Sequence, residues 1–194
     1  MTPHGSLSSR APYSYLDTTV ADITAHLGPD CYSGVVFLSS TPFPSWNKEV
    51  LTPWRKDIIS RLEASNVFGA SSIMREFVRA FTYDPENVDR RTQFSWIGGF
   101  VSHEVVTKPS SLFSEEPLRK AAKAGKVSAL VLLGKDNMCL ESEKVEGLYK
   151  ETFKSVEVHI WPKVGHLQCF EEPEMTRNAI LAFVEKVAPR SLPG

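Results

Sequence analysis

Three short apolar runs separated by helical patterns constrain the fold of this chain more than any other feature. The runs are VVFL at 35–38, ALVLL at 129–133 and VEVHIWP at 156–162. Continuous apolar runs of this length, bounded by turn residues, are typical of parallel strands that are buried on both faces. Because helical patterns lie between them, the sequence predicts an α/β fold with about three parallel strands and right-handed crossovers.

The helices around these runs are predicted from apolar periodicity and from end signals. A helix at 16–27 places Leu16, Val20, Ile23 and Leu27 on one face and ends at the turn GPD. The last helix, 173–187, begins with Pro173, and its predicted buried stripe is Ile180, Phe183, Val184 and Val187. Two further helices are predicted, one that ends at Gly125 and one that has Ser142 as its N-cap.

The section from Phe43 to Glu116 differs from the rest of the chain. It is rich in aromatic residues, carries three helical patterns and shows no β alternation. At about 70 residues it is too long for a structureless loop. We therefore predict a helical insertion at about 43–116, within one domain that spans 16–194, and an irregular segment at 1–15.

Charge and cysteine content exclude several classes of protein. The 194 residues carry a formal net charge of −1, so there is no basic excess with which to bind nucleic acid. No apolar run approaches the roughly 20 residues needed to span a bilayer, and residues 1–15 lack the apolar core of a secretory signal. Three cysteines without close pairing favour free thiols, so we expect a cytoplasmic protein with no membrane partner.

His166 is the strongest candidate for a functional side chain. It lies five residues after Trp161, at the expected end of the third strand, while Asp136 and Asn137 follow the second strand. The carboxyl ends of parallel strands share one edge of a sheet, and an acid beside an imidazole there can orient a general base. The alternative from position alone is a loop histidine that makes a backbone hydrogen bond, and both interpretations stay open at this point.

The order of these segments resembles the α/β-hydrolase family. The resemblance rests on ALVLLGKDN, on VEVHIWPKVGHLQCFEEPE with the amphipathic helix after it, and on ADITAHLGPDCYSGVVFLSSTP. The insertion resembles the helical lid of the family. Its segments SIMREFVRAFTYDPENV and FSWIGGFVS are similar in sequence to those of fungal members. The resemblance implies a partial α/β-hydrolase fold and serine-type hydrolysis of small, apolar, ester-like substrates without a cofactor.

The resemblance also implies roles for individual residues. His166 matches the catalytic histidine. The acid of the family falls three residues after Gly134, where this chain has Asn137, with Asp136 one place earlier. An asparagine can orient an imidazole but cannot stabilise its charged form, and Asp136 could take the role if the turn is shifted. No metal is expected, because His159, His166 and Cys169 match no standard zinc spacing.

The nucleophile motif of the family, Gly-x-Ser-x-Gly, does not occur in the chain. Ser71 has the Gly-x-Ser spacing but lies in the insertion, and Ile73 stands at the final glycine position. We therefore expect a truncated or mis-predicted gene product that is inactive as given. The alternative is a non-catalytic remnant or small-molecule binding module. The edge of the 35–38 strand would then be unpaired, which predicts oligomers or aggregation.

Overall fold

The computed structural model describes residues 15–65, 67–102 and 114–188. Its centre is a parallel sheet of three strands in the order β1 (Val35–Leu38), β2 (Ser128–Gly134) and β3 (Ser155–Trp161). Val36 pairs with Leu130, and Leu132 pairs with His159. The three predicted strands are thus confirmed to within one residue at most ends, and β2 lies in the middle.

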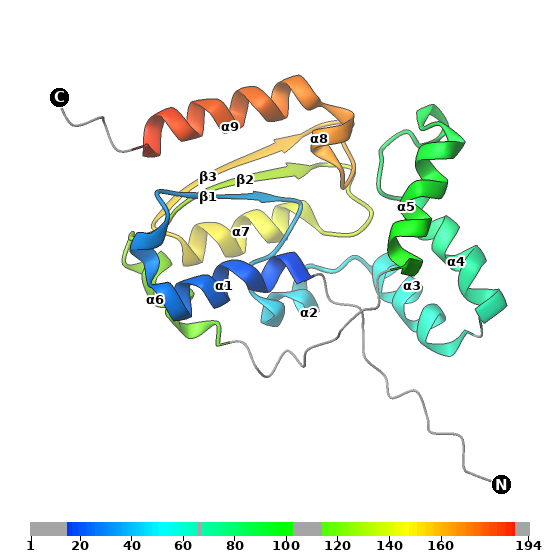
Figure 1. Cartoon of the computed structure of the whole chain (residues 1–194), viewed down its shortest axis with the longest axis horizontal. Coiled ribbons are helices and arrows are strands. Elements are labelled where there is room, and N and C mark those ends of the chain that lie inside the picture. Colours follow the sequence, from blue (N-terminus) through cyan, green and yellow to red (C-terminus); the bar gives the residue numbers. More distant parts are fainter. Residues whose placement is uncertain (1–14, 66, 103–113, 189–194) are drawn as a thin grey trace, which may run out of the picture.

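Helices cover both faces of the sheet, as Figure 1 shows. One face packs against α1 (Tyr15–Leu27), α6 (Glu116–Lys123) and α7 (Ser142–Thr152), and the other against α9 (Pro173–Val187). Side chains of β2 alternate between them: Val131 and Leu133 join the cluster that includes α6 and α7, whereas Leu130 and Leu132 join the cluster with Phe183 of α9. This double coverage explains why the run SALVLLG is apolar without alternation.

The insertion between β1 and α6 is helical wherever the structure describes it. Two short helical turns (Pro44–Trp46 and Pro85–Asn87) accompany α2 (Asn47–Val50), α3 (Pro53–Ala64), α4 (Val67–Arg79) and α5 (Arg90–Ser102). Helices α3, α4 and α5 lie beyond the carboxyl ends of the strands, beside the short helix α8 (Gln168–Glu171) (Figure 1). Residues 103–113 of the predicted insertion, and 1–14 of the predicted irregular segment, lie outside the described residues.

The ends of two helices show one correct and one wrong prediction. Gly125 ends α6 at a φ of 73°, with Gly125 N donating to Ala122 O and Lys126 N donating to Ala121 O, both at 3.0 Å. Ser142, however, is the first residue of α7 and not its N-cap, because Glu141 holds that position. The Ser142 hydroxyl instead donates to Gly134 O at 2.6 Å and thereby satisfies a buried carbonyl at the end of β2.

The predicted stripe of α9 is wrong at Val184, which is 47% exposed. Phe183 belongs to an apolar cluster with Leu130 and Leu132 of β2, and Ile180 and Val187 pack against that cluster. Val184, one position or about 100° past Phe183, therefore faces away from the sheet. Periodicity placed the stripe, and packing on the sheet decided its centre.

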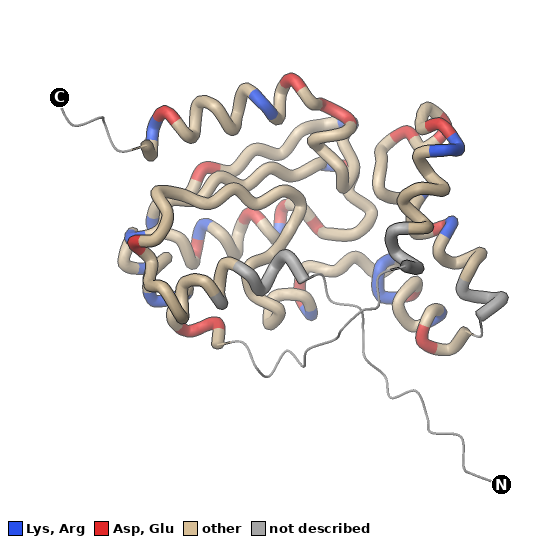
Figure 2. Tube along the Cα trace, in the orientation of Figure 1, with Lys and Arg blue, Asp and Glu red and all other residues tan. Residues whose placement is uncertain are grey.

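Residues of both charge signs are mixed along the helices and loops, as the colours of the trace in Figure 2 show. None of the helices that the structure describes is long and apolar enough to cross a bilayer.

Within the described part of the chain β1 pairs with β2 alone, and Leu38 at its end is 37% exposed. An apolar strand therefore forms one edge of the sheet.

Candidate active site

The loop that carries His166 is packed against the turn that follows β2. Lys135 N donates to Trp161 O at 2.8 Å, and Asp136 N donates to Val164 O at 3.1 Å. A Cβ atom at Gly134 would lie 2.1 Å from the carbonyl oxygen of Gly165, so only glycine permits this approach. The two segments that the sequence predicted to meet at the carboxyl edge of the sheet thus lie side by side.

The two candidate acids have other hydrogen-bond partners in this structure. Asp136 Oδ2 accepts from Lys163 N at 2.8 Å, where Lys163 adopts a left-handed φ of 58°. Asn137 is buried, and its Oδ1 accepts from Cys139 N at 2.9 Å and from Leu140 N at 3.3 Å. The turn is therefore next to the His166 loop, but among the described residues neither side chain hydrogen-bonds to the imidazole.

A buried polar network beneath the site was not foreseen from the sequence. Ser39 directly follows β1, is 3% exposed, and accepts from Asn137 Nδ2 at 3.1 Å. Gln168, 1% exposed, accepts from Ser39 Oγ and from Gly134 N at 3.1 Å, and its amide nitrogen donates to His166 O at 3.2 Å. This orientation of the amide satisfies both of its ends, since the opposite one would set its oxygen against His166 O.

The network joins polar groups at the ends of all three strands. The only sequence signal for it was a serine pair directly after an apolar run and a glutamine two residues after His166. Such residues are common in loops, so the sequence could not distinguish them from exposed ones. Their burial became evident only when the three strand ends were brought together.

His166 itself is half-buried between the loop and the insertion. Its backbone N donates to Phe81 O at 2.7 Å, and its ring centroid lies 5.5 Å from that of Phe81. Its Nδ1 is buried and has no hydrogen-bond partner among the residues that the structure describes. Burial, and secondly the positive charge of Arg55, lower the pKa of His166 to about 4. The imidazole is therefore neutral at pH 7, the form that a general base requires, although its basicity is weak.

Arg55 brings a positive charge into the same region from α3. Its guanidinium carbon lies 4.0 Å above the ring centroid of Phe77, which in turn lies 4.6 Å from that of Phe81. Burial lowers the pKa of Arg55, but not enough to discharge a guanidinium. Arg55 was not singled out by sequence analysis, because charged residues on helices are usually solvated.

Several candidate nucleophiles lack the required geometry. Ser71 is exposed within α4 and does not sit on a strand-to-helix turn. Ser39 follows a strand at a φ of 42°, but it is buried and hydrogen-bonded, and Pro42 follows in place of a helix. Burial raises the pKa of Cys139 to about 11, so its thiol stays protonated at neutral pH.

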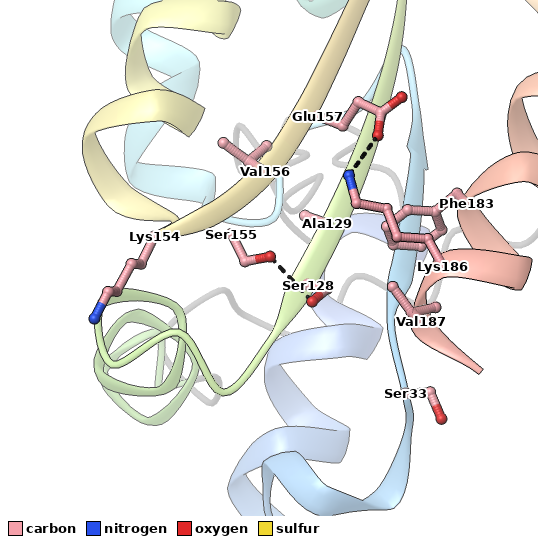
Figure 3. Close-up of a pocket in the computed structure, with 10 residues that line it drawn as sticks. All are labelled: Ser33, Ser128, Ala129, Lys154, Ser155, Val156, Glu157, Phe183, Lys186 and Val187. Carbon is pink, nitrogen blue, oxygen red and sulfur yellow. Dashed lines mark hydrogen bonds and ion pairs between the residues drawn. The ribbon is translucent and has the colours of Figure 1, made fainter. Parts of the chain in front are cut away.

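A hollow of about 510 Å³ lies at the opposite edge of the sheet (Figure 3). It is lined by the first residues of β2 and β3 and the end of α9, with Ser128 Oγ 3.1 Å from Ser155 Oγ. This hollow lies at the amino ends of the strands, far from the His166 edge.

The described residues offer no metal site. His159 on β3 pairs with Glu157, with 2.9 Å between Nε2 and Oε1. In the described part of the chain no group of three His, Cys, Asp or Glu side chains could hold a metal ion.

No family model and no curated protein matches this sequence. Solved structures do match. An esterase (RhEst1) from Rhodococcus sp. ECU1013 aligns with a TM-score of 0.72 and 14% identity, over 91% of this chain and 64% of the other. The 2-hydroxy-6-oxo-6-phenylhexa-2,4-dienoate hydrolase of Rhodococcus sp. strain RHA1 gives 0.65 and 16%, over 87% and 60%.

Naproxen esterase from Bacillus subtilis gives a TM-score of 0.61 at 16% identity, over 86% of this chain and 56% of its own. The chain thus spans about three-fifths of the length of these structures. At such identities the likeness shows the fold alone, and it agrees with the parallel sheet and helical layers described above. The chain has a partial α/β-hydrolase fold.

Proposed function

We propose that this chain supplies the general base of a serine-type hydrolase that acts on small, apolar, ester-like substrates. The observation that carries the proposal is the place of His166, a neutral imidazole at the carboxyl edge of the sheet, between the β2 turn and the insertion. Groups at this edge are where α/β sheets gather their chemistry. The insertion would act as a lid, and its amino-acid sequence suggests a relationship to fungal members of the fold.

The mechanism needs two components that the described residues do not contain. A serine hydroxyl on a strained turn would attack the carbonyl carbon of the ester, while His166 accepts the hydroxyl proton and later passes it to the leaving alcohol. Backbone N–H donors would stabilise the oxyanion. We propose that a longer form of the protein supplies both, and that the 194-residue chain alone is inactive.

The role of the acid is also part of the proposal. Asp136 Oδ2 would have to give up the hydrogen bond from Lys163 N and accept one from His166 Nδ1–H, a nitrogen that has no partner among the described residues. Asn137 would have to leave a buried network, which costs more because its amide makes three hydrogen bonds there. We therefore favour Asp136.

The state of the cysteines bears on the cellular compartment that we propose. Cys31, Cys139 and Cys169 are all free thiols, and Cys31 and Cys169 are exposed. Exposed free thiols persist best in a reducing environment, so we propose a cytoplasmic location.

Labelling with a fluorophosphonate serine-hydrolase probe tests the function. A chain extended upstream by an in-frame segment with a Gly-x-Ser-x-Gly turn is expected to label. His166→Ala should abolish labelling, whereas His159→Ala, which changes a histidine paired with Glu157 on β3, should preserve it. The 194-residue chain should not label. Labelling that persists in His166→Ala would refute His166 as the base.

A non-catalytic binding role is the second candidate. It is favoured by the hydrogen bonds that engage both Asp136 and Asn137 away from His166. If an extended chain with an intact serine turn stays unlabelled, the result favours the non-catalytic binding role over the hydrolase.

A further inference from the structure

The insertion meets the His166 loop through backbone atoms. Phe81 O accepts from His166 N at 2.7 Å and from Leu167 N at 3.1 Å. A Cβ atom at Gly165 would lie 2.7 Å from Tyr83 N and 2.9 Å from Phe81 O, so the two segments are in direct contact. The segment Phe81–Tyr83 follows α4 and therefore connects the insertion to the loop that carries the candidate base.

One carboxylate bridges these two segments. Glu171, in the short helix α8, accepts from Tyr83 N through Oε1 at 2.5 Å and from Gly165 N through Oε2 at 2.8 Å. Each oxygen thus holds a different segment: one holds the insertion and the other holds the residue just before His166. No role for Glu171 follows from the base, nucleophile and acid of the proposed reaction.

We propose that Glu171 is a positioning residue that fastens the insertion to the His166 loop, so that the two move as one unit. While Glu171 is bound at both ends, the Phe81 ring stays against the imidazole and keeps it buried. Loss of the bridge would free the insertion and expose His166 to water. The role of His166 as a base rests on the proposed function, but the bridge itself rests only on these contacts.

The chemistry of the site requires a carboxylate. The Tyr83 and Gly165 groups from which Glu171 accepts are N–H donors, and an ionised carboxylate offers an acceptor oxygen to each. A glutamine of the same shape would set its own NH₂ against one of them. Burial raises the pKa of Glu171, the backbone hydrogen bonds from Tyr83, Gly165 and Leu167 oppose that rise, and the charge of Glu172 adds a smaller rise.

Because the pKa of Glu171 is raised in the folded state, protonation relieves a buried charge and favours the folded chain, so acid is not expected to release the bridge through this group. Other titratable groups on the segments joined here are Glu172, His166 and, directly after Tyr83, Asp84. Burial, and secondly the charge of Arg55, lower the pKa of His166 to about 4.

Amide hydrogen exchange on the 194-residue chain tests the bridge. In Glu171→Gln the Tyr83 and Gly165 amides should exchange about tenfold faster or more, because a hydrogen bond to a charged group is lost. The Leu132 amide in β2 should be unaffected. Glu174→Gln is the matched control, since that carboxylate lies at the start of α9 and pairs with exposed Arg177.

Two further readouts separate positioning from simple destabilisation. In Glu171→Gln the pKa of His166, followed by NMR, should rise from about 4 toward its ordinary value near 6.5, because the ring becomes hydrated. Glu171→Asp, which keeps both oxygens, should retain more protection than Glu171→Gln.

The proposal is overturned if Tyr83 and Gly165 exchange at wild-type rates in Glu171→Gln, if Glu174→Gln has an equal effect, or if the pKa of His166 does not move. These measurements need no turnover. A failure of probe labelling would therefore count against the hydrolase function and leave the bridge intact.

Discussion

Gly134→Ala tests whether the approach of two loops at the carboxyl edge positions His166. The added Cβ would lie 2.1 Å from Gly165 O and 2.2 Å from Val164 O, whereas an ordinary contact begins at 3.4 Å. The loop would have to move by about 1.3 Å, and because the contacting atoms of Val164 and Gly165 are backbone atoms, no side-chain rotation can relieve the clash. The candidate base would be displaced with the loop.

The expected cost combines strain with lost hydrogen bonds. Overpacking costs about 1–3 kcal/mol. The bonds from Asp136 N to Val164 O and from Lys135 N to Trp161 O would lengthen or break, at about 0.5–1.5 kcal/mol each. We therefore expect the free energy of unfolding to fall by about 3–5 kcal/mol, a large part of the ~5–15 kcal/mol typical of a domain.

Urea unfolding followed by tryptophan fluorescence, at one fixed protein concentration, measures this loss. The matched control is Gly147→Ala in α7, where an added Cβ would meet nothing within 4 Å. Because alanine favours a helix over glycine, the control should be about 0.5–1 kcal/mol more stable than the wild type. If Gly134→Ala unfolds within 1 kcal/mol of the wild type, the close approach of the two loops is not a structural requirement.

Four other predictions concern the site and the sheet edge. Arg55→Gln should raise the pKa of His166 above about 4, yet below its ordinary value because burial remains the larger cause, and an NMR titration that shows no change would contradict this. Since the folded pKa is the lower one, the wild type should lose stability as pH falls from about 6.5 through about 4, as histidine protonation favours the unfolded chain. Ser39→Ala should cost about 1–3 kcal/mol in urea unfolding by leaving buried amides without a partner, whereas Ser128→Ala, at the exposed end of β2, should cost under 0.5 kcal/mol. The chain should form oligomers through β1, and Leu38→Lys should shift it toward monomers in light scattering; a wild type that is already monomeric would refute the open-edge argument.

The sequence by itself determined the secondary structure near the site. The runs at 35–38, 129–133 and 156–162 became the three strands, because buried parallel strands need apolar residues on both faces. Gly125 ended its helix as predicted, since a left-handed φ strongly favours glycine. His166 was placed at the correct edge by its distance from the third strand alone. These features depend on the spacing of residues close together in the chain, which can be read directly from the sequence.

Tertiary structure decided which atoms meet. Ser142 was expected to cap its helix, but its hydroxyl donates a hydrogen bond to Gly134 O, a carbonyl eight residues away in sequence. Asn137 and Asp136 were placed beside His166, yet Ser39 and Lys163 take their hydrogen bonds. A polar side chain has several possible partners, and the fold selects among them by burial and direction, which depend on residues far apart in the chain.

The same holds for the groups around the candidate base. Arg55 and Glu171 read as ordinary surface charges, because nothing within a few residues of either suggests burial. Only the packing of the insertion against the His166 loop places one charge where it lowers the pKa of the imidazole and the other where it holds two backbone amides. Local sequence determined where the helices and strands lie, whereas long-range packing determined the electrostatics of the site, because charge and solvation depend on every segment that surrounds a group.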